Sequence, residues 1–226
     1  MTLHNLMAMA VGLLVAQSIG CGRVFTQTPT PTAETLHLAV VFFPDQVSGL
    51  LANGAEVDEL DAHGNSALWV AARLSRKESV GLLLAAGANA NLRGKNGWTP
   101  LHCTAFCGSA VGDIGIAKLL INAGADVNAV EPEYGETPLH YAVRVAESPD
   151  LVRLLLVSGA KIDAQSYPGR DTALQFSVAR RNHTITEILL DAGASPTIVN
   201  SVGFVPQQQA PEDESIARLF EKYATR

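Results

Sequence analysis

A glycine-containing phrase recurs five times along this 226-residue chain. Its copies contain Gly54, Gly87, Gly124, Gly159 and Gly193, which lie at intervals of 33, 37, 35 and 34 residues. A period of this length is typical of a helical solenoid, whose units bury their apolar faces only against neighbouring units. The spacing therefore predicts one continuous array rather than separate globular domains. The copies read "LLANGAEVDEL", "LLAAGANANL", "LINAGADVNAV", "LLVSGAKIDAQ" and "LLDAGASPTIV".

A second phrase precedes each glycine and predicts a pair of short helices in each unit. In the copy around "GWTPLHCTA", Gly97 suits a turn and Thr99 can cap a first helix. Leu101 starts the apolar face of that helix, and Ile116 belongs to the apolar face of a second helix. Gly124 is expected to end the second helix in the left-handed conformation. The other copies are "GNSALWVAA", "GETPLHYAV", "GRDTALQFSV" and the partial "ETLHLAV".

The phrases "TPLH", at 99–102 and 137–140, and "GADVNA", at 124–129, resemble the ankyrin repeat. The resemblance covers roughly residues 33–226 and implies an all-α solenoid of antiparallel helix pairs with projecting β-turn fingers. It also implies that the histidine of "TPLH" bonds backbone and threonine groups between repeats. His37, His102 and His140 occupy this place, and Trp69 and Gln175 replace it elsewhere. The predicted repeats span about 33–60, 61–93, 94–130, 131–165 and 166–199, followed by a capping repeat at 200–226.

The first 32 residues are predicted to lie outside the fold. Residues 6–16 form an uninterrupted apolar run. The run is too short to span a bilayer but suits a signal peptide over residues 1–20. No Lys or Arg precedes it, which departs from the usual signal. Cys21 directly after Gly20 resembles the lipid-attachment cysteine of bacterial lipoproteins, although Ser18 departs from that pattern. Residues 21–32 then form a Thr/Pro-rich tether. We expect an outer-membrane lipoprotein facing the periplasm; the alternative is a cleaved signal and a soluble periplasmic or secreted protein.

Composition argues against several classes of function. The net charge is -6 and no run of Lys or Arg is present, so nucleic acid is not an expected partner. We find no Gly-rich phosphate loop, nucleophile elbow or metal-ligand cluster, and we expect neither a cofactor nor an enzyme. The alternative is a thiol enzyme that uses His102 with Cys103 or Cys107. Whether these two cysteines form a disulfide stays open at this point.

The expected function is non-enzymatic binding of another protein by a monomer. One version is an immunity or antitoxin protein that neutralises an enzyme in the bacterial envelope; the alternative is a scaffold for an envelope enzyme. A third interpretation is a eukaryotic ankyrin protein with a glycosylation sequon at 182–184.

The resemblance implies binding through fingertips and the concave side of the first helices. Large aromatic residues and arginines are the usual anchors of such interfaces. Insertions at 109–112 and 146–150 also lengthen the links between helices and can mark a binding face. The fingertip candidates are His63, Lys95, Asn96, Trp98, Tyr134, Glu136 and Arg170, and the helix candidates are Arg73, Phe106, Arg144 and Arg180.

Overall fold

The computed structural model describes residues 32–106, 113–145, 147–209 and 212–224. Every regular element in these ranges is a helix, which confirms the predicted all-α class. The elements are α2 (Ala33–Phe42), η1 (Pro44–Gln46), α3 (Val47–Ala52), α4 (Ala67–Arg73), α5 (Lys77–Ala85), α6 (Pro100–Phe106), α7 (Ile114–Asn122), α8 (Pro138–Arg144), α9 (Pro149–Val157), α10 (Ala173–Ala179), α11 (His183–Asp191), η2 (Pro206–Gln209) and α12 (Glu214–Ala224).

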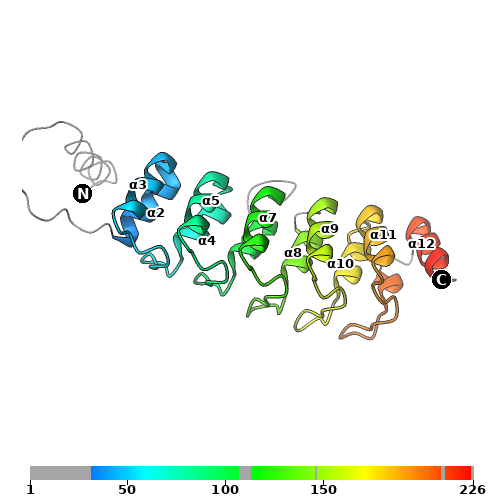
Figure 1. Cartoon of the computed structure of the whole chain (residues 1–226). Coiled ribbons are helices and arrows are strands. Elements are labelled where there is room, and N and C mark those ends of the chain that lie inside the picture. Colours follow the sequence, from blue (N-terminus) through cyan, green and yellow to red (C-terminus); the bar gives the residue numbers. More distant parts are fainter. Residues whose placement is uncertain (1–31, 107–112, 146, 210–211, 225–226) are drawn as a thin grey trace, which may run out of the picture.

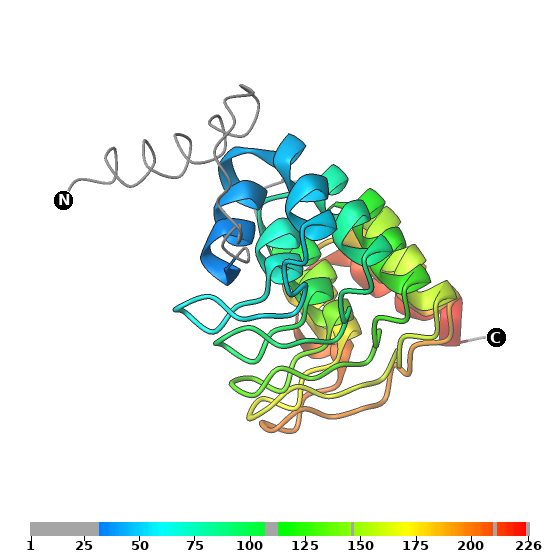
Figure 2. The same cartoon turned by 60° about the vertical axis from the view of Figure 1, so that its left-hand side comes forward.

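The helices form two layers that run the length of the molecule (Figure 1). The first helices of successive pairs, α2, α4, α6, α8 and α10, pack side by side. The second helices, α3, α5, α7, α9 and α11, form the other layer, and α12 packs on α11 at the C-terminal end. Long loops between pairs project to one side as a row of fingers (Figure 2). This arrangement is the predicted solenoid.

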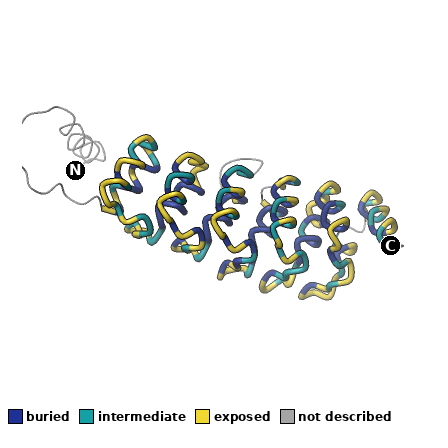
Figure 3. The backbone as a smooth tube through the Cα atoms, in the orientation of Figure 1, coloured by how far each residue is buried: buried dark blue, intermediate teal, exposed yellow. Residues whose placement is uncertain are grey.

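The hydrophobic core is a band between the two layers (Figure 3). Leu36, Leu68, Leu101, Leu139 and Leu174 occupy the same place in five successive first helices, and none is more than 1% exposed. These helices have 7 to 10 residues, which is too short for stability in isolation. Their stability therefore comes from the neighbouring repeats.

Side-chain hydrogen bonds set the register between repeats. Four equivalent residues, each four positions after a repeat glycine, accept a hydrogen bond from a backbone N–H of the next repeat. Because this ladder continues from the first repeat to the fifth, each unit is fixed relative to its neighbour. The bonds run from Asn89 N to Asp58 (3.0 Å), Asp126 N to Asn91 (2.7 Å), Lys161 N to Asn128 (2.7 Å) and Ser195 N to Asp163 (2.9 Å).

Two glycines take the conformations that the sequence predicts. Gly124 follows α7 with φ +85°, and Gly97 lies in the second finger with φ +74°. Gly97 has an additional constraint, because a Cβ there would lie 2.4 Å from the ring of Pro132 in the next finger. The fingers therefore pack directly on each other at this point.

The second repeat shows a compensated departure from the pattern. Trp69 stands where other repeats have histidine, and its indole Nε1 is buried without a hydrogen-bond partner among the described residues. The indole extends towards Gly94, where a Cβ would lie 2.8 Å from it. The corresponding residues in two other fingers, Asp61 and Glu131, carry carboxylates. Gly94 thus makes the room that a larger side chain at 69 requires.

The C-terminal repeat begins with η2 in place of a first helix and ends with α12. Ile216 and Phe220 of α12 are buried against the array. Ionic and hydrogen-bonding contacts at its edge join Lys222 to Glu187 (2.8 Å) and the Tyr223 hydroxyl to Asp191 (2.6 Å). An end repeat must present a polar outer face to solvent, and α12 does so.

Candidate functional site

His102, which suggested chemistry in the sequence, and its equivalent His140 are part of the scaffold. Nδ1 of each ring receives the backbone N–H of its helix cap, Thr99 (3.2 Å) or Thr137 (3.1 Å). Nε2 of His102 lies 3.3 Å from the carbonyl oxygen of Glu136 in the next repeat, and Nε2 of His140 lies 3.0 Å from that of Ala164. These bonds use a neutral ring protonated on Nε2. The role that the resemblance implied for these histidines is confirmed.

Burial keeps both rings neutral. Desolvation lowers the pKa of His102 and of His140 to about 4, against the partial compensation of the carbonyl hydrogen bonds. Gln175 performs the same task without titrating, because its Oε1 accepts from Thr172 N (2.8 Å) and its Nε2 donates to Phe204 O (3.0 Å). A glutamine suffices at this position, so the position is structural.

The alternative of a thiol enzyme finds no support in the geometry of His102. Both of its ring nitrogens are engaged in the scaffold, and His102 and Cys103 are fully buried, which keeps substrates away from them. Cys107 and the inserted link 109–112 lie outside the described residues, so the pairing of Cys103 with Cys107 stays a question for experiment.

The centre of the array carries a cluster of aromatic rings contributed by two adjacent repeats. The Trp98 ring lies 4.6 Å from that of Phe106 and 4.9 Å from that of Tyr141, measured between ring centroids. Tyr141 is buried, whereas Phe106 is 50% exposed. The expectation that Trp98 is an exposed fingertip is wrong, because its ring is half-buried between its own first helix and the next one.

A buried ion pair lies beside these rings and corrects a second expectation. Glu136, predicted as a fingertip residue, has a side chain only 5% exposed and pairs with Arg144 at 2.7 Å. Burial raises the pKa of Glu136, and the Arg144 hydrogen bond and charge oppose that shift. The Arg144 guanidinium lies over Tyr141 (5.3 Å) and Phe176 (5.9 Å). Its side chain stays 31% exposed, so one face of this cation reaches solvent.

Glu131, a residue that the sequence did not single out, builds the third finger. Its fully buried carboxylate accepts the backbone N–H groups of Glu133 (2.8 Å), Tyr134 (2.7 Å) and Glu136 (3.1 Å). A hydrogen bond from Glu131 N to Glu136 O closes the finger. It spans one residue more than the bond from Asp61 N to Asn65 O that closes the first finger. Asn65 and Trp98 close the first two fingers through the same carbonyl, so Glu136, like them, lies at the base of its finger. Tyr134 is at the tip and 46% exposed, as predicted.

The last three fingers are joined through their backbones and expose an apolar residue each. Tyr167 N donates to Tyr134 O, and Ser201 N donates to Gly169 O at 2.8 Å. Tyr167 is 70% exposed and Val202 is 68% exposed. Neither was a candidate in the sequence, where Arg170 marked the fourth tip. A tyrosine before a proline within the turn was the available signal.

The remaining candidates are exposed and lie on several faces. His63, Lys95 and Asn96 lie on the first two fingers. The others make local contacts: Arg73 lies over the Trp69 ring at 5.3 Å, Arg170 donates to Gln165, and Arg180 pairs with Glu147 at 3.1 Å. Cys21 lies outside the described residues.

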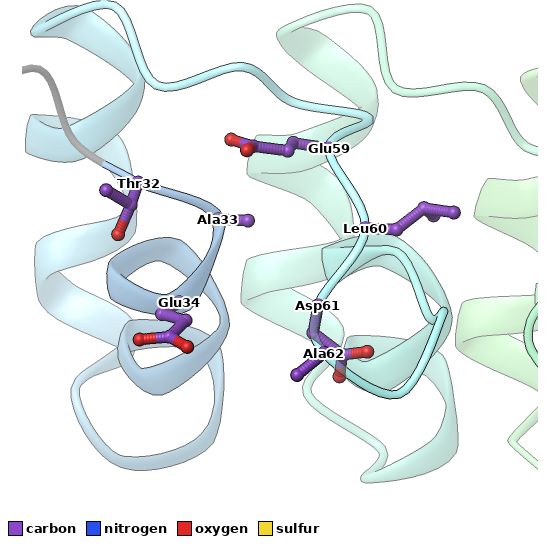
Figure 4. A pocket seen from close by; sticks show the side chains of 7 residues that line it. All are labelled: Thr32, Ala33, Glu34, Glu59, Leu60, Asp61 and Ala62. Carbon is purple, nitrogen blue, oxygen red and sulfur yellow. The ribbon is translucent and has the colours of Figure 1, made fainter.

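An open hollow of about 360 Å³ lies at the N-terminal end of the array (Figure 4). It is formed by the start of α2, at 32–34, and by the segment that enters the first finger, at 59–62. The carboxylates of Glu34, Glu59 and Asp61 make it acidic. Across the described ranges, no group of three or more His, Cys, Asp or Glu side chains is placed to hold a metal ion. Within those ranges, too, none of the helices has the length and apolar character needed to span a membrane.

Comparison with known proteins gives a consistent family match. The family described as ankyrin repeats (3 copies) matches residues 36–131, 78–166 and 109–200. The Nuclear factor NF-kappa-B p105 subunit of Gallus gallus is 36% identical over 182 residues, covering 79% of this chain and 18% of that protein. The B-cell lymphoma 3 protein homolog of Mus musculus is 32% identical over 170 residues, covering 73% of this chain and 37% of that protein. The chain thus spans well under half the length of these relatives.

The same likeness holds in three dimensions. The crystal structure of the ankyrin repeat domain of Bcl-3, described as a member of the IkappaB protein family, superposes with a TM-score of 0.74 at 28% sequence identity. The match covers 96% of this chain and 94% of that domain. The similarity therefore includes the whole array rather than one or two repeats.

Proposed function

The chain belongs to the ankyrin repeat family, and from this premise we propose that it binds a partner protein at the surface formed by Phe106, Tyr134 and Arg144. The observation that carries the proposal is the exposed ring of Phe106 on a rigid base of Trp98 and Tyr141. Aromatic and arginine side chains that are fixed before binding lose little entropy in a complex. Tyr134 is 46% exposed at the tip of the third finger, so two repeats contribute to the proposed surface.

Truncation of the two exposed rings tests this proposal. Phe106→Ala and Tyr134→Ala together should weaken binding at least about thirtyfold, since interface aromatics commonly contribute 2 kcal/mol or more. The measurement is a pull-down with the wild-type and variant proteins as bait, followed by the affinity of the recovered partner. Val157→Ala is the matched control, because Val157 is 83% exposed on the other helix layer. Unchanged recovery with the double variant would rule out this surface.

Trp98→Ala should behave differently from Tyr134→Ala. The half-buried Trp98 ring packs on Phe106 and Tyr141, so its loss should cost roughly 3 kcal/mol of folding free energy. Tyr134 is exposed at a fingertip, and its truncation should change stability by no more than about 0.5 kcal/mol. Urea unfolding of the two variants measures both values. Equal stabilities would mean that the Trp98 ring does not support the cluster.

We also propose that Cys21 carries a lipid that holds the protein at the outer membrane, on the periplasmic side. The apolar run at 6–16, the cysteine after Gly20 and the Thr/Pro-rich segment before α2 support this. Cys21→Ser should move the protein from the membrane fraction to the soluble fraction of expressing cells. The measurement is immunoblotting of both fractions, with Cys103→Ser as control. A wild-type protein that is already soluble contradicts the lipid anchor and favours a cleaved signal.

Within the envelope we propose that the partner is an enzyme that this protein neutralises. The support is the exposed Phe106 ring on its rigid base, a surface suited to tight binding of a folded protein. Adding the protein to the recovered partner should then lower the partner's catalytic rate. An unchanged rate at saturating protein would favour the scaffold alternative.

A further inference from the structure

One edge of the array combines exposed apolar side chains with arginines. This first-helix edge consists of the C-terminal ends of α2, α4, α6, α8 and α10 and the described residues that follow them, which leave out 107–112 and 146. Phe42, Leu74, Phe106 and Val145 occur there, one in each of four successive repeats, and are 37 to 50% exposed. Because the first helices pack side by side, these four residues form a row along the molecule.

The same edge gathers positive charge in a chain of net charge -6. Five of the chain's 16 basic residues lie there. Arg144 is already paired with Glu136, and Arg180 with Glu147. Three arginines without an ion pair among the described residues remain beside two carboxylates, a small excess of positive charge in an acidic molecule. Its basic residues are Arg73, Arg76, Arg144, Arg180 and Arg181, and its acidic residues are Asp45, Asp113 and Glu147.

The helix dipole favours two of these arginines. A cation near a helix C-terminus is favourable by roughly 0.3–1 kcal/mol, and Arg73 and Arg144 lie in the last turns of α4 and α8. The second helices have the same dipole, yet α5, α7, α9 and α11 carry no basic residue in their last turns. The first helices α2, α6 and α10 carry none either, so last-turn arginines occur on two of the five first helices.

Two of the arginines are held in place before any partner binds. The guanidinium of Arg73 lies 5.3 Å over the Trp69 ring, and that of Arg144 lies 5.3 Å over the Tyr141 ring. Arg73 makes no ion pair within the described part of the chain. Arg144 already donates to Glu136, whereas the stacked guanidinium of Arg73 retains its donors for a planar carboxylate and loses little freedom on binding it.

Backbone conformation gives an independent indication that side chains matter at this edge. Ser75, Glu147 and Arg181 lie in the turns after α4, α8 and α10 with φ of +54°, +46° and +54°. A side chain in this left-handed region costs roughly 1–2 kcal/mol that glycine avoids. Three successive described turns thus tolerate strain and keep a polar side chain at the edge, which is typical of functional surfaces.

We propose that the first-helix edge binds an acidic segment of a partner protein. Apolar side chains of this segment contact the row of Phe42, Leu74, Phe106 and Val145, and its carboxylates lie beside the arginines. This inference rests on the proposed function, because Phe106 belongs to both surfaces. Helix packing distances of 8–10 Å place the ends of the row about 27 Å apart. An extended segment of about eight residues, or a helix of about 18, covers that length.

A display library of random 20-residue peptides, selected on the purified full chain, tests the chemistry of the occupant. Peptides enriched by the wild type should be more acidic than the input library and rich in apolar residues. Their affinity should fall at least tenfold in Arg73→Glu/Arg180→Glu, two exposed positions on the edge. The matched control is Lys118→Glu/Arg153→Glu, which makes the same charge change on the second-helix layer. Thermal melting of both double variants checks that they fold.

The outcomes separate this inference from the proposed function. Acidic peptides that lose affinity only in the edge variant support the inference. Enrichment of neutral or basic peptides, no enrichment, or equal losses in both double variants overturn it. In any of these cases, a partner that is still lost from the Phe106→Ala/Tyr134→Ala bait leaves the proposed function standing. A partner retained by that bait removes the proposed function as well.

Discussion

Acidification from pH 7 to pH 4 is expected to lower the free energy of unfolding by about 3 kcal/mol for each of His102 and His140. Burial holds the pKa of both rings at about 4 in the folded protein, whereas an unfolded histidine titrates near 6.5. Below pH 6.5 the unfolded chain therefore binds protons that the folded chain does not bind. The stabilisation is fully present above pH 6.5 and is lost as the pH falls towards 4.

The geometry gives the reason for this large effect. A second proton would have to reside on Nδ1, which in each ring receives a backbone N–H from Thr99 or Thr137. Protonation would place two donors against each other in a buried site and add an uncompensated charge. Since each ring also bonds to the next repeat, acid weakens the contacts between repeats rather than one helix alone.

The double substitution His102→Gln/His140→Gln isolates this contribution from that of the carboxylates. Gln175 shows that glutamine makes the equivalent bonds in the fifth repeat. Urea unfolding of wild type and variant between pH 4 and pH 8 should give curves that run parallel above pH 7. Below pH 6.5 the wild type should lose stability more steeply. Curves that stay parallel down to pH 4 would contradict the neutral state of the two rings.

The sequence predicted most of the fold because the signals are local and repeated. Positions such as Thr99, Leu101 and Gly124 specify a cap, a core contact and a helix end by their own chemistry. Each repeat contacts only its neighbours, so a correct reading of one unit extends to the array. The structural role of His102 followed in the same way, from its replacement by Trp69 and Gln175.

The candidate site was harder to predict because it depends on contacts between fingers. Glu136 aligns with Asn65 and Trp98, and the backbone bonds that close the three fingers place all three residues at the base rather than at the tip. Trp98 is next to a turn in sequence, yet its ring packs against the rings of Phe106 and Tyr141 and is half-buried. Exposure at such positions depends on one or two residues of loop length and on side chains from the next repeat.

Coupled substitutions between repeats were equally hidden in the sequence. Gly94 departs from the acidic residues at the start of two other fingers, and a Cβ there would lie 2.8 Å from both the indole of Trp69 and Oδ1 of Asn65. Tyr167 was not a candidate because Gly169 and Arg170 are the residues that mark this turn in the sequence. The cause of Gly94 lies about 25 positions away in the chain, at Trp69, and Tyr167 stands out only by its solvent exposure. Neither feature produces a periodic pattern in the sequence.

Truncation of the equivalent leucines Leu101, Leu139 and Leu174 to alanine is expected to cost about 2–5 kcal/mol each, the range of other buried leucines. None is more than 1% exposed, and each contributes to the continuous core between the two helix layers. A cavity at any of them removes contacts with its own second helix and with neighbouring repeats. Urea unfolding, fitted with a separate slope for each variant, measures the losses.

The same experiment tests the repeat alignment itself. Leu101 and Leu139 have a full repeat on both sides, whereas Leu174 has the shorter η2–α12 repeat on one side. Because stability in a solenoid is a sum of units and neighbouring interfaces, the central substitutions should uncouple the two halves of the array and broaden the transition. Leu174→Ala should mainly release the C-terminal repeat. Val157→Ala, at an exposed position, should stay within about 0.5 kcal/mol of wild type. Losses below about 1 kcal/mol at all three leucines would contradict the equivalence of these positions.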